Sequence, residues 1–153
     1  MAYWLMKSEP DVFGIDDLQR AGVEPWDGVR NYQVRNMIRD RMQVGDLAFF
    51  YHSNCPVPGI VGIMRICRAG YPDQSAFDPQ HRSFDPKSEP ANPRWYCVDV
   101  EFVTKFRGVI SLAWLKRQPQ MAECPLVQRG NRLSIMPLTE AQWNFISDHS
   151  QWR

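Results

Sequence analysis

The chain has 153 residues, which fits one domain, because domains commonly contain about 100–150 residues. Hydrophobic residues make up 44% and charged residues 23%, a composition typical of a globular protein and not of a disordered one. Its 18 basic and 17 acidic residues leave a net charge of +1, whereas a protein that coats long nucleic acid usually carries a clear basic excess. We therefore expect one domain, residues 1–153, that does not grip nucleic acid by charge alone.

The cysteines and the N-terminal residues indicate the compartment. Cys55, Cys67, Cys97 and Cys124 show no C-x-x-C spacing and no nearby histidine pair, so we interpret them as reduced thiols. Residues 3–6 are strand-like without a basic leader, and no segment approaches the ~20 apolar residues of a membrane helix. We expect a cytoplasmic protein with no metal, no cofactor and no membrane partner.

The first third of the chain predicts short strands and helices. A strand over residues 3–6 ends before Pro10, because proline cannot donate a hydrogen bond to a sheet. A helix over 15–21 is favoured by two aspartates in its first turn, where the helix dipole favours negative charge. The segment 26–32 (W-D-G-V-R-N-Y) indicates a turn, and apolar residues at helical spacing predict a second helix over 31–42.

The middle of the chain predicts a sheet interrupted by a long loop. Apolar runs predict strands over 47–51 and 60–67, the second buried on both faces. Residues 71–93 contain five prolines, and a loop this long inside a compact domain is usually functional or mobile. Alternating polar and apolar residues then predict the clearest strand of the chain over 95–106.

The last third predicts two helices around a strand. A helix is expected over 111–116 and a strand over 132–136. Thr139 and Gln142 form a capping-box pattern that opens a helix over 140–146. About five strands without regular alternation with helices indicate an α+β fold with a curled or barrel-like sheet.

No cluster of residues predicts catalysis. A cysteine nucleophile would need a histidine beside it in space, and His52 and Cys55 are close only in sequence. The motifs of serine hydrolases, P-loop proteins and zinc deaminases are absent from the sequence. We predict no catalytic residue, and interpret Cys55 as a packing thiol and His52 as a solvated or pocket-wall imidazole.

Three short clusters favour binding of a flat ligand instead. They place aromatic rings beside polar groups, a combination that holds a nucleobase by stacking and by hydrogen bonds to its edges. Structural interpretations stay open: Trp26 also suits a core, Asn31 the N-cap of a helix, and Ser8 and Ser53 a turn. The clusters are Lys7 and Ser8; Trp26, Asn31 and Tyr32; and Tyr51, His52, Ser53 and Asn54.

The longer motifs resemble the EVE domain family. They are Y-W-L-M-K-S-E-P (3–10), W-D-G-V-R-N-Y-Q-V-R-N (26–36), V-G-D-L-A-F-F-Y-H-S (44–53), G-I-V-G-I (59–63), D-P-K-S (85–88), R-W-Y-C-V-D-V (94–100) and R-G-N-R-L-S (129–134). The resemblance spans nearly the whole chain and is weakest in the proline-rich loop. It implies a PUA-like fold: a mixed, strongly curved sheet that closes into a pseudobarrel, with short helices at its rims.

The resemblance also implies a function. EVE proteins are regarded as readers of modified bases, notably modified cytosines in DNA, and are related to YTH domains, which bind methylated adenine in RNA. Carried over by motif, Trp26 would stack on the base, Asn31 would read its edge, and Arg132 would hold a phosphate or a base carbonyl. The full set of expected ligand-binding residues is Lys7, Ser8, Trp26, Asn31, Tyr32, Tyr51, His52, Ser53, Asn54, Arg132 and Ser134.

The function expected from the sequence is therefore non-catalytic recognition of a modified nucleobase in DNA or RNA. We expect a monomer, because no heptad pattern or spare apolar helix face is present. The alternatives from other classes are a hydrolase that acts on a modified nucleoside or nucleotide, and a protein-interaction adaptor.

Overall fold

A computed structural model describes residues 1–150, so residues 151–153 of the predicted domain lie outside the described part. The strands are β1 (Tyr3–Ser8), β2 (Val23–Trp26), β3 (Leu47–His52), β4 (Gly59–Pro72), β5 (Tyr96–Ser111) and β6 (Ile135–Leu138). The α-helices are α1 (Ile15–Ala21), α2 (Tyr32–Asp40), α3 (Leu112–Lys116) and α4 (Glu140–Ser150). Short 3-10 helices, η1 (Gln74–Phe77), η2 (Pro119–Met121) and η3 (Pro125–Val127), lie in the connections.

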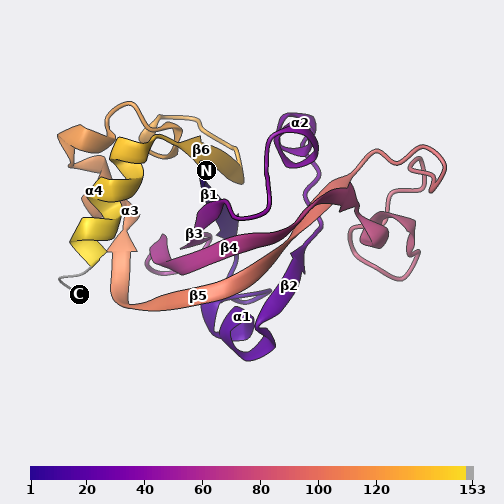
Figure 1. Ribbon diagram of the computed structural model, residues 1–153, viewed down its shortest axis with the longest axis horizontal. Helices are drawn as coiled ribbons and strands as arrows, with labels where there is room; N and C mark the ends of the chain where they lie inside the picture. Colours follow the sequence, from indigo (N-terminus) through magenta and orange to yellow (C-terminus); the bar gives the residue numbers. More distant parts are fainter. Residues whose placement is uncertain (151–153) are drawn as a thin grey trace.

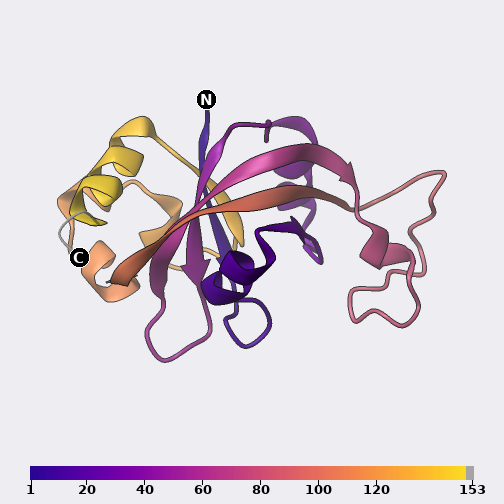
Figure 2. The same ribbon diagram turned by 60° about the horizontal axis from the view of Figure 1, so that its bottom comes forward.

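The strands form one mixed sheet in the order β2-β5-β4-β3-β1-β6. β1 and β3 run parallel, and the other neighbouring pairs are antiparallel. The long strands β4 and β5 curve together through the molecule (Figures 1 and 2), and their register shifts at several points, as bulges in bent sheets require. The predicted mixed, curved sheet of an α+β fold is confirmed. Within residues 1–150, β2 and β6 end the sheet, which is therefore not closed into a barrel.

Two apolar layers cover the two faces of the central strands. In β1, Trp4 and Met6 belong to one layer and Leu5 to the other, because successive side chains of a strand point to opposite faces. In β3, Phe50 and Phe49 divide in the same way. Buried residues of α1 and α2 complete the first layer, and those of α3 and α4 complete the second. We call them the α1–α2 layer and the α3–α4 layer.

Local sequence signals set the end of α1 and the starts of α2 and α4 as predicted. Gly22 ends α1 with a φ of 79°, a conformation that favours glycine. The Asn31 Oδ1 atom accepts a hydrogen bond from the Val34 N–H at 3.0 Å, so Asn31 is the N-cap of α2. Thr139 and Gln142 exchange both hydrogen bonds of the predicted capping box, at 3.0 and 3.1 Å.

The largest difference from the prediction lies at Trp26. The turn expected to begin at this residue instead follows β2, whose last residue is Trp26 and which pairs with β5. β2 gives a weak signal because it has four residues and contains Pro25, which is tolerated here because β2 is an edge strand. The sheet therefore has six strands rather than about five.

Other predicted elements change their bounds. β1 runs to Ser8 and α4 to Ser150, past the expected ends at 6 and 146, whereas α2 ends at Asp40, before the expected end at 42. β4 and β5 extend to Pro72 and Ser111, past the expected ends at 67 and 106, because each is the other's partner over most of its length. β6 starts only at Ile135, where it pairs with Met6 of β1. Arg132 consequently lies in the loop before β6 and not on the strand.

The proline-rich loop between β4 and β5 lies at the opposite end of the molecule from α3 and α4 (Figure 1). It carries η1 near its start, and the isolated bridge between Glu89 and Asn92 near its end. The helices in the described residues are all too short or too polar to cross a membrane.

Candidate functional site

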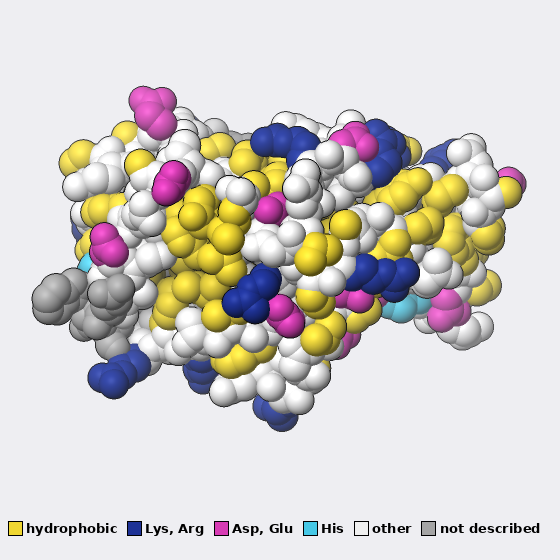
Figure 3. Space-filling view, viewed as in Figure 1, with side chains coloured by type: hydrophobic (Ala, Val, Ile, Leu, Met, Phe, Trp, Pro, Cys, Tyr) yellow, Lys and Arg dark blue, Asp and Glu magenta, His cyan; other side chains and the backbone are white. Residues whose placement is uncertain are grey.

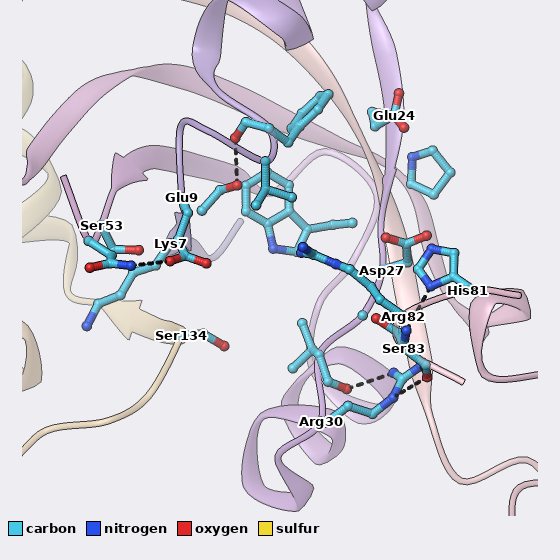
Figure 4. A pocket seen from close by; sticks show the side chains of 18 of the residues that line it. Lys7, Glu9, Glu24, Asp27, Arg30, Ser53, His81, Arg82, Ser83 and Ser134 are labelled. Carbon is cyan, nitrogen blue, oxygen red and sulfur yellow. Dashed lines mark hydrogen bonds between the residues drawn. The ribbon is translucent and has the colours of Figure 1, made fainter. Parts of the chain in front are cut away.

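A cavity of about 630 Å³ opens where β1 and β3 end. Because these strands are parallel, their C-terminal ends meet at one edge of the sheet. Five separate parts of the chain form its walls, and Figure 4 shows most of their side chains. These parts are residues 7–9 with 12–13, residues 24–30, residues 53–54, residues 81–83 and residues 132–134.

Trp26 contributes an aromatic surface to the cavity. Its side chain is only 7% exposed, and it packs edge-on against Phe50 at 5.2 Å and Phe13 at 6.5 Å between ring centroids. It belongs to the α1–α2 layer and lines the cavity at the same time. Trp26 is therefore a core residue and a cavity-lining residue at once.

The proline-rich loop supplies one wall of the cavity through His81, Arg82 and Ser83. The Arg30 guanidinium donates hydrogen bonds to the Ser83 carbonyl at 2.6 and 3.1 Å. Gly28 approaches this wall so closely that an added Cβ would lie 2.9 Å from the Ser83 Oγ atom. Contacts over more than 50 residues of sequence thus hold the loop against the segment that follows β2.

Asp73 is the buried anchor of this wall. Its Oδ2 atom accepts hydrogen bonds from the Gly28 N–H at 2.9 Å and from Arg30 at 3.0 Å, and its Oδ1 atom accepts two more from Ser75. Burial by itself would raise the pKa of Asp73, but the hydrogen bonds from Ser75, Gly28 and Arg30 lower it below its usual value. Asp73 therefore stays ionised and remains paired with the Arg30 guanidinium.

Three other cations line the cavity. Within residues 1–150, Lys7, Arg82 and Arg132 form no ion pair, and all three line the cavity. Lys7 lies over the Tyr51 ring at 5.7 Å, and burial lowers the pKa of its ammonium group. An anionic ligand group would supply the missing partner.

Acidic groups lie between these cations. The Glu9 carboxylate accepts a hydrogen bond from the Asn54 amide at 2.5 Å, and Asn54 adopts a φ of 51° at the cavity rim. Glu24 and Asp27 line the wall beside Trp26. Burial raises the pKa of both carboxyl groups. The charge of Asp27 raises the pKa of Glu24 further, and the charge of Asp73 raises the pKa of Asp27. The cavity thus offers both hydrogen-bond acceptors and unpaired cations.

The comparison with known proteins decides the family. The model of the EVE domain family matches residues 2–149 of the chain. The chain belongs to the EVE domain family. Human thymocyte nuclear protein 1 is 42% identical over 163 aligned residues, which cover 95% of this chain and 72% of the human protein. A related protein of Schizosaccharomyces pombe, C21.03c, is 42% identical and covers 97% of this chain and 68% of its own length.

Solved structures of EVE relatives superimpose closely. The Pseudomonas syringae protein PSPTO5229 has a TM-score of 0.95 at 52% identity, covering 97% of this chain and 99% of its own. Human THYN1, solved in complex with DNA that contains 5-methylcytosine, has a TM-score of 0.89 at 41% identity, covering 99% of this chain and 98% of its own. The predicted family and fold are confirmed.

The structure of this EVE domain brings many of the predicted ligand residues together. The Ser8 hydroxyl donates to the Phe13 carbonyl at 2.6 Å and so shapes the turn that follows β1. The Lys7 N–H donates to the Ser134 carbonyl at 2.8 Å, which joins two walls of the cavity. The predicted residues that line the cavity are Lys7, Ser8, Trp26, Ser53, Asn54, Arg132 and Ser134.

Four predicted residues lie outside the cavity walls, and each has a structural partner. Asn31 caps α2, and Tyr32 stacks on Trp95 at 4.8 Å between ring centroids. Tyr51 is 2% exposed in the α3–α4 layer, on the other face of the sheet. The His52 Nε2 atom accepts a hydrogen bond from the Ile15 N–H at 3.1 Å. In this structure the four side chains make contacts that stabilise the fold and do not line the cavity.

The cavity also contains residues that the sequence analysis did not name. Asp27, Gly28 and Arg30 lie inside the W-D-G-V-R-N-Y motif, where only Trp26, Asn31 and Tyr32 were selected. Their position inside a motif that matches the family is the sequence signal that could have identified them. Residues 81–83 lie in the part of the chain that resembles the family least, and no local pattern marks them.

The enzyme interpretation finds little support in the titratable groups. Burial raises the pKa of the thiols of Cys67, Cys97 and Cys124, which disfavours the thiolate that a nucleophile needs. His52 uses its Nε2 atom as an acceptor for α1, and burial lowers its pKa. In residues 1–150 no group of three or more His, Cys, Asp or Glu side chains is placed to hold a metal ion.

Proposed function

We propose that this EVE domain binds DNA that carries 5-methylcytosine and takes the modified base into the cavity beside Trp26. The observation that carries the proposal is the cavity itself, which combines an aromatic surface with cations that form no ion pair within residues 1–150, in a protein that superimposes on the DNA-bound human relative. Its volume of about 630 Å³ lies in the usual range of ligand pockets, about 300–1,000 Å³. A base in a duplex reaches such a pocket when it is flipped out of the stack.

The walls match the parts of a methylated nucleotide. Phe13, Val29 and Leu133 offer apolar surface for the ring and its methyl group. Arg82 and Arg132 offer charge to the phosphates on either side of the flipped base. On the face seen in Figure 3, basic and acidic side chains are interspersed and form no continuous basic patch. This agrees with the net charge of +1.

The first test compares two duplexes that differ by one methyl group. One carries a central 5-methylcytosine, the other cytosine, and binding is followed by fluorescence anisotropy at several salt concentrations. One buried methyl group is worth about 0.8 kcal/mol, so we expect roughly fourfold tighter binding of the methylated duplex. Equal affinity for the two duplexes would contradict the proposal. The same oligonucleotides made as RNA decide between the two nucleic acids.

The second test asks whether the cations at the cavity contact phosphate. Arg132→Ala removes a cavity cation, and Arg129→Ala removes a matched, exposed charge in the same segment outside the cavity. Loss of one phosphate contact weakens binding and reduces the slope of log K against log salt by about 1. We expect this change for Arg132→Ala only. An identical slope for both variants and the wild type would remove Arg132 from the interface.

Trp26 is best tested by a conservative change. Trp26→Ala removes a core residue, so it is expected to cost about 3–5 kcal/mol of stability as well as affinity. Trp26→Phe keeps an aromatic surface and much of the packing. We expect Trp26→Phe to unfold cooperatively and to retain most of the affinity for the methylated duplex, whereas Trp26→Leu, of similar burial but without a ring, loses about 1–3 kcal/mol of binding.

A further inference from the structure

Asp27 occupies a special position in the cavity. It directly follows Trp26 at the end of β2 and lies beside the loop wall, next to His81 in Figure 4. Asp73, His81 and Arg30 are the side chains whose charges act on its carboxyl group. His81 belongs to the loop wall, and Asp73 and Arg30 hold that wall in place. The charges that act on Glu24, two residues before Trp26, are those of Asp27 and Asp99. Asp27 therefore lies between the aromatic surface and the loop.

Apart from its own backbone N–H, the Asp27 carboxylate has no donor in the described part of the chain. Within residues 1–150 it forms no ion pair and no hydrogen bond with the side chain of another residue. Two of the acids nearby are supplied: Asp73 accepts four hydrogen bonds, and Glu9 accepts one from Asn54. Within residues 1–150 Glu24 forms no ion pair, but it precedes Trp26 and is not acted on by the charges of the loop wall. Burial and the charge of Asp73 both disfavour the Asp27 anion and raise its pKa. Asp27 is exposed in the open cavity, so a ligand that enters this corner displaces water from the carboxylate and must bring a donor in its place.

We propose that Asp27 accepts a hydrogen bond from the exocyclic amine of the flipped base and so selects 5-methylcytosine against thymine. This inference rests on the proposed function, since it assigns a residue to the base edge within the same cavity. An ionised carboxylate can only accept, and the cytosine N4 amine can only donate. Thymine presents the O4 oxygen at the same position, which leaves two acceptors facing one another.

The comparison of 5-methylcytosine with thymine isolates this contact. Both bases carry the same 5-methyl group, so they differ only along the Watson–Crick edge. Three duplexes with 5-methylcytosine, cytosine or thymine at one position, each opposite an abasic site, remove the different costs of breaking the base pair. Affinities are measured by anisotropy at pH 8. We expect the wild type to prefer 5-methylcytosine to thymine by about 5- to 150-fold.

The informative variant is Asp27→Asn. The asparagine amide both donates and accepts, so it pairs with either base, and we expect the preference for 5-methylcytosine over thymine to fall at least fivefold. The preference for 5-methylcytosine over cytosine should remain, because the methyl contact is unchanged. Asp11→Asn removes an equal charge from an exposed position outside the cavity and should alter neither ratio. Urea unfolding confirms that each variant folds.

The outcomes separate the two proposals. A wild type that binds none of the duplexes, or binds 5-methylcytosine and cytosine equally, overturns the proposed function and this inference with it. A wild type that prefers 5-methylcytosine to cytosine but not to thymine overturns the role of Asp27 alone. An Asp27→Asn variant with the wild-type preference over thymine, or with equal losses for all three duplexes, does the same.

Discussion

The α1–α2 layer and the α3–α4 layer share strands β1 and β3 but differ in how they are completed. In the α3–α4 layer, Trp143 stacks on Phe49 at 3.9 Å and on Tyr3 at 4.8 Å between ring centroids, so an aromatic cluster closes the end of the molecule. At the cavity end, the α1–α2 layer stops at Trp26 and Phe13, and the next wall is held by hydrogen bonds to Asp73.

This difference has a functional consequence. An apolar layer that is filled by its own side chains leaves no room for a ligand. A wall anchored by polar contacts over long sequence distances can stand away from the core and keep a cavity open. The substitutions below test whether stability and binding are divided between the two ends in this way.

The largest effect is expected for Phe49→Ala. Phe49 is fully buried, and its truncation removes the surface on which Trp143 stacks. We expect a loss of about 3–5 kcal/mol in the free energy of unfolding, measured in urea. Affinity for the methylated duplex, measured at low temperature where the variant is folded, should be unchanged. A folded Phe49→Ala variant with weakened binding would show that the two ends are coupled.

A smaller loss of stability but a clear loss of binding is expected for Asp73→Asn. All four hydrogen-bond partners of Asp73 are donors, so an amide NH₂ group would leave some of them unsatisfied, at about 1–3 kcal/mol. Release of the loop wall should weaken binding as well. Asp78→Asn, an exposed change in the same loop, is the control. Unaltered affinity in Asp73→Asn would mean that the wall is dispensable.

The lowered pKa of Asp73 also predicts how the free energy of unfolding changes at acid pH. Because the pKa of Asp73 is lowered in the folded protein, its contribution is fully present above the unfolded value of about 3.9. It is lost as the pH falls through the folded pKa. The difference in stability between the wild type and Asp73→Asn should therefore shrink in that acid range.

Gly28→Ala is expected to cost about 1–2 kcal/mol from its φ of 79° alone. The contact of the new Cβ with the Ser83 Oγ atom adds to this cost. Gly130→Ala is the matched control, because Gly130 has the same φ and no atom near its Cβ position. We expect the excess cost of Gly28→Ala to disappear in combination with Ser83→Gly. Equal losses of stability for Gly28→Ala and Gly130→Ala would show that the Ser83 side chain moves away from the new Cβ without cost.

The smallest effect concerns His52 and the start of α1. Burial lowers the pKa of His52, so its neutral form is favoured in the folded protein, and that form accepts from the Ile15 N–H. Stability should be complete above the unfolded pKa of about 6.5 and decline as the pH falls below it. One lost hydrogen bond is worth about 0.5–1.5 kcal/mol. His52→Gln should remove this decline, whereas His81→Gln should leave it in place.

The secondary structure could be predicted wherever its cause is local. The capping box of Thr139 and Gln142, the glycine after α1 and the alternation in β5 are contained within a few residues of sequence. β2 was missed because a four-residue edge strand with a proline has almost no local signal, and its pairing with β5 supplies what the sequence segment lacks. The ends of β4 and β5 depend in the same way on mutual pairing.

The residues of the cavity fall into the same two groups, those marked by local sequence and those placed by tertiary contacts. The EVE family and the motifs that contain Lys7, Trp26 and Ser53 can be read from the sequence, because these residues lie within matched segments. That Asn31 caps a helix while Asp27 faces the cavity depends on the fold, since both are polar residues of one motif. The loop wall depends on a contact between residues 53 positions apart, Arg30 and Ser83, and on the burial of Asp73. Such contacts form only after the chain has folded, so no local pattern of residues encodes them.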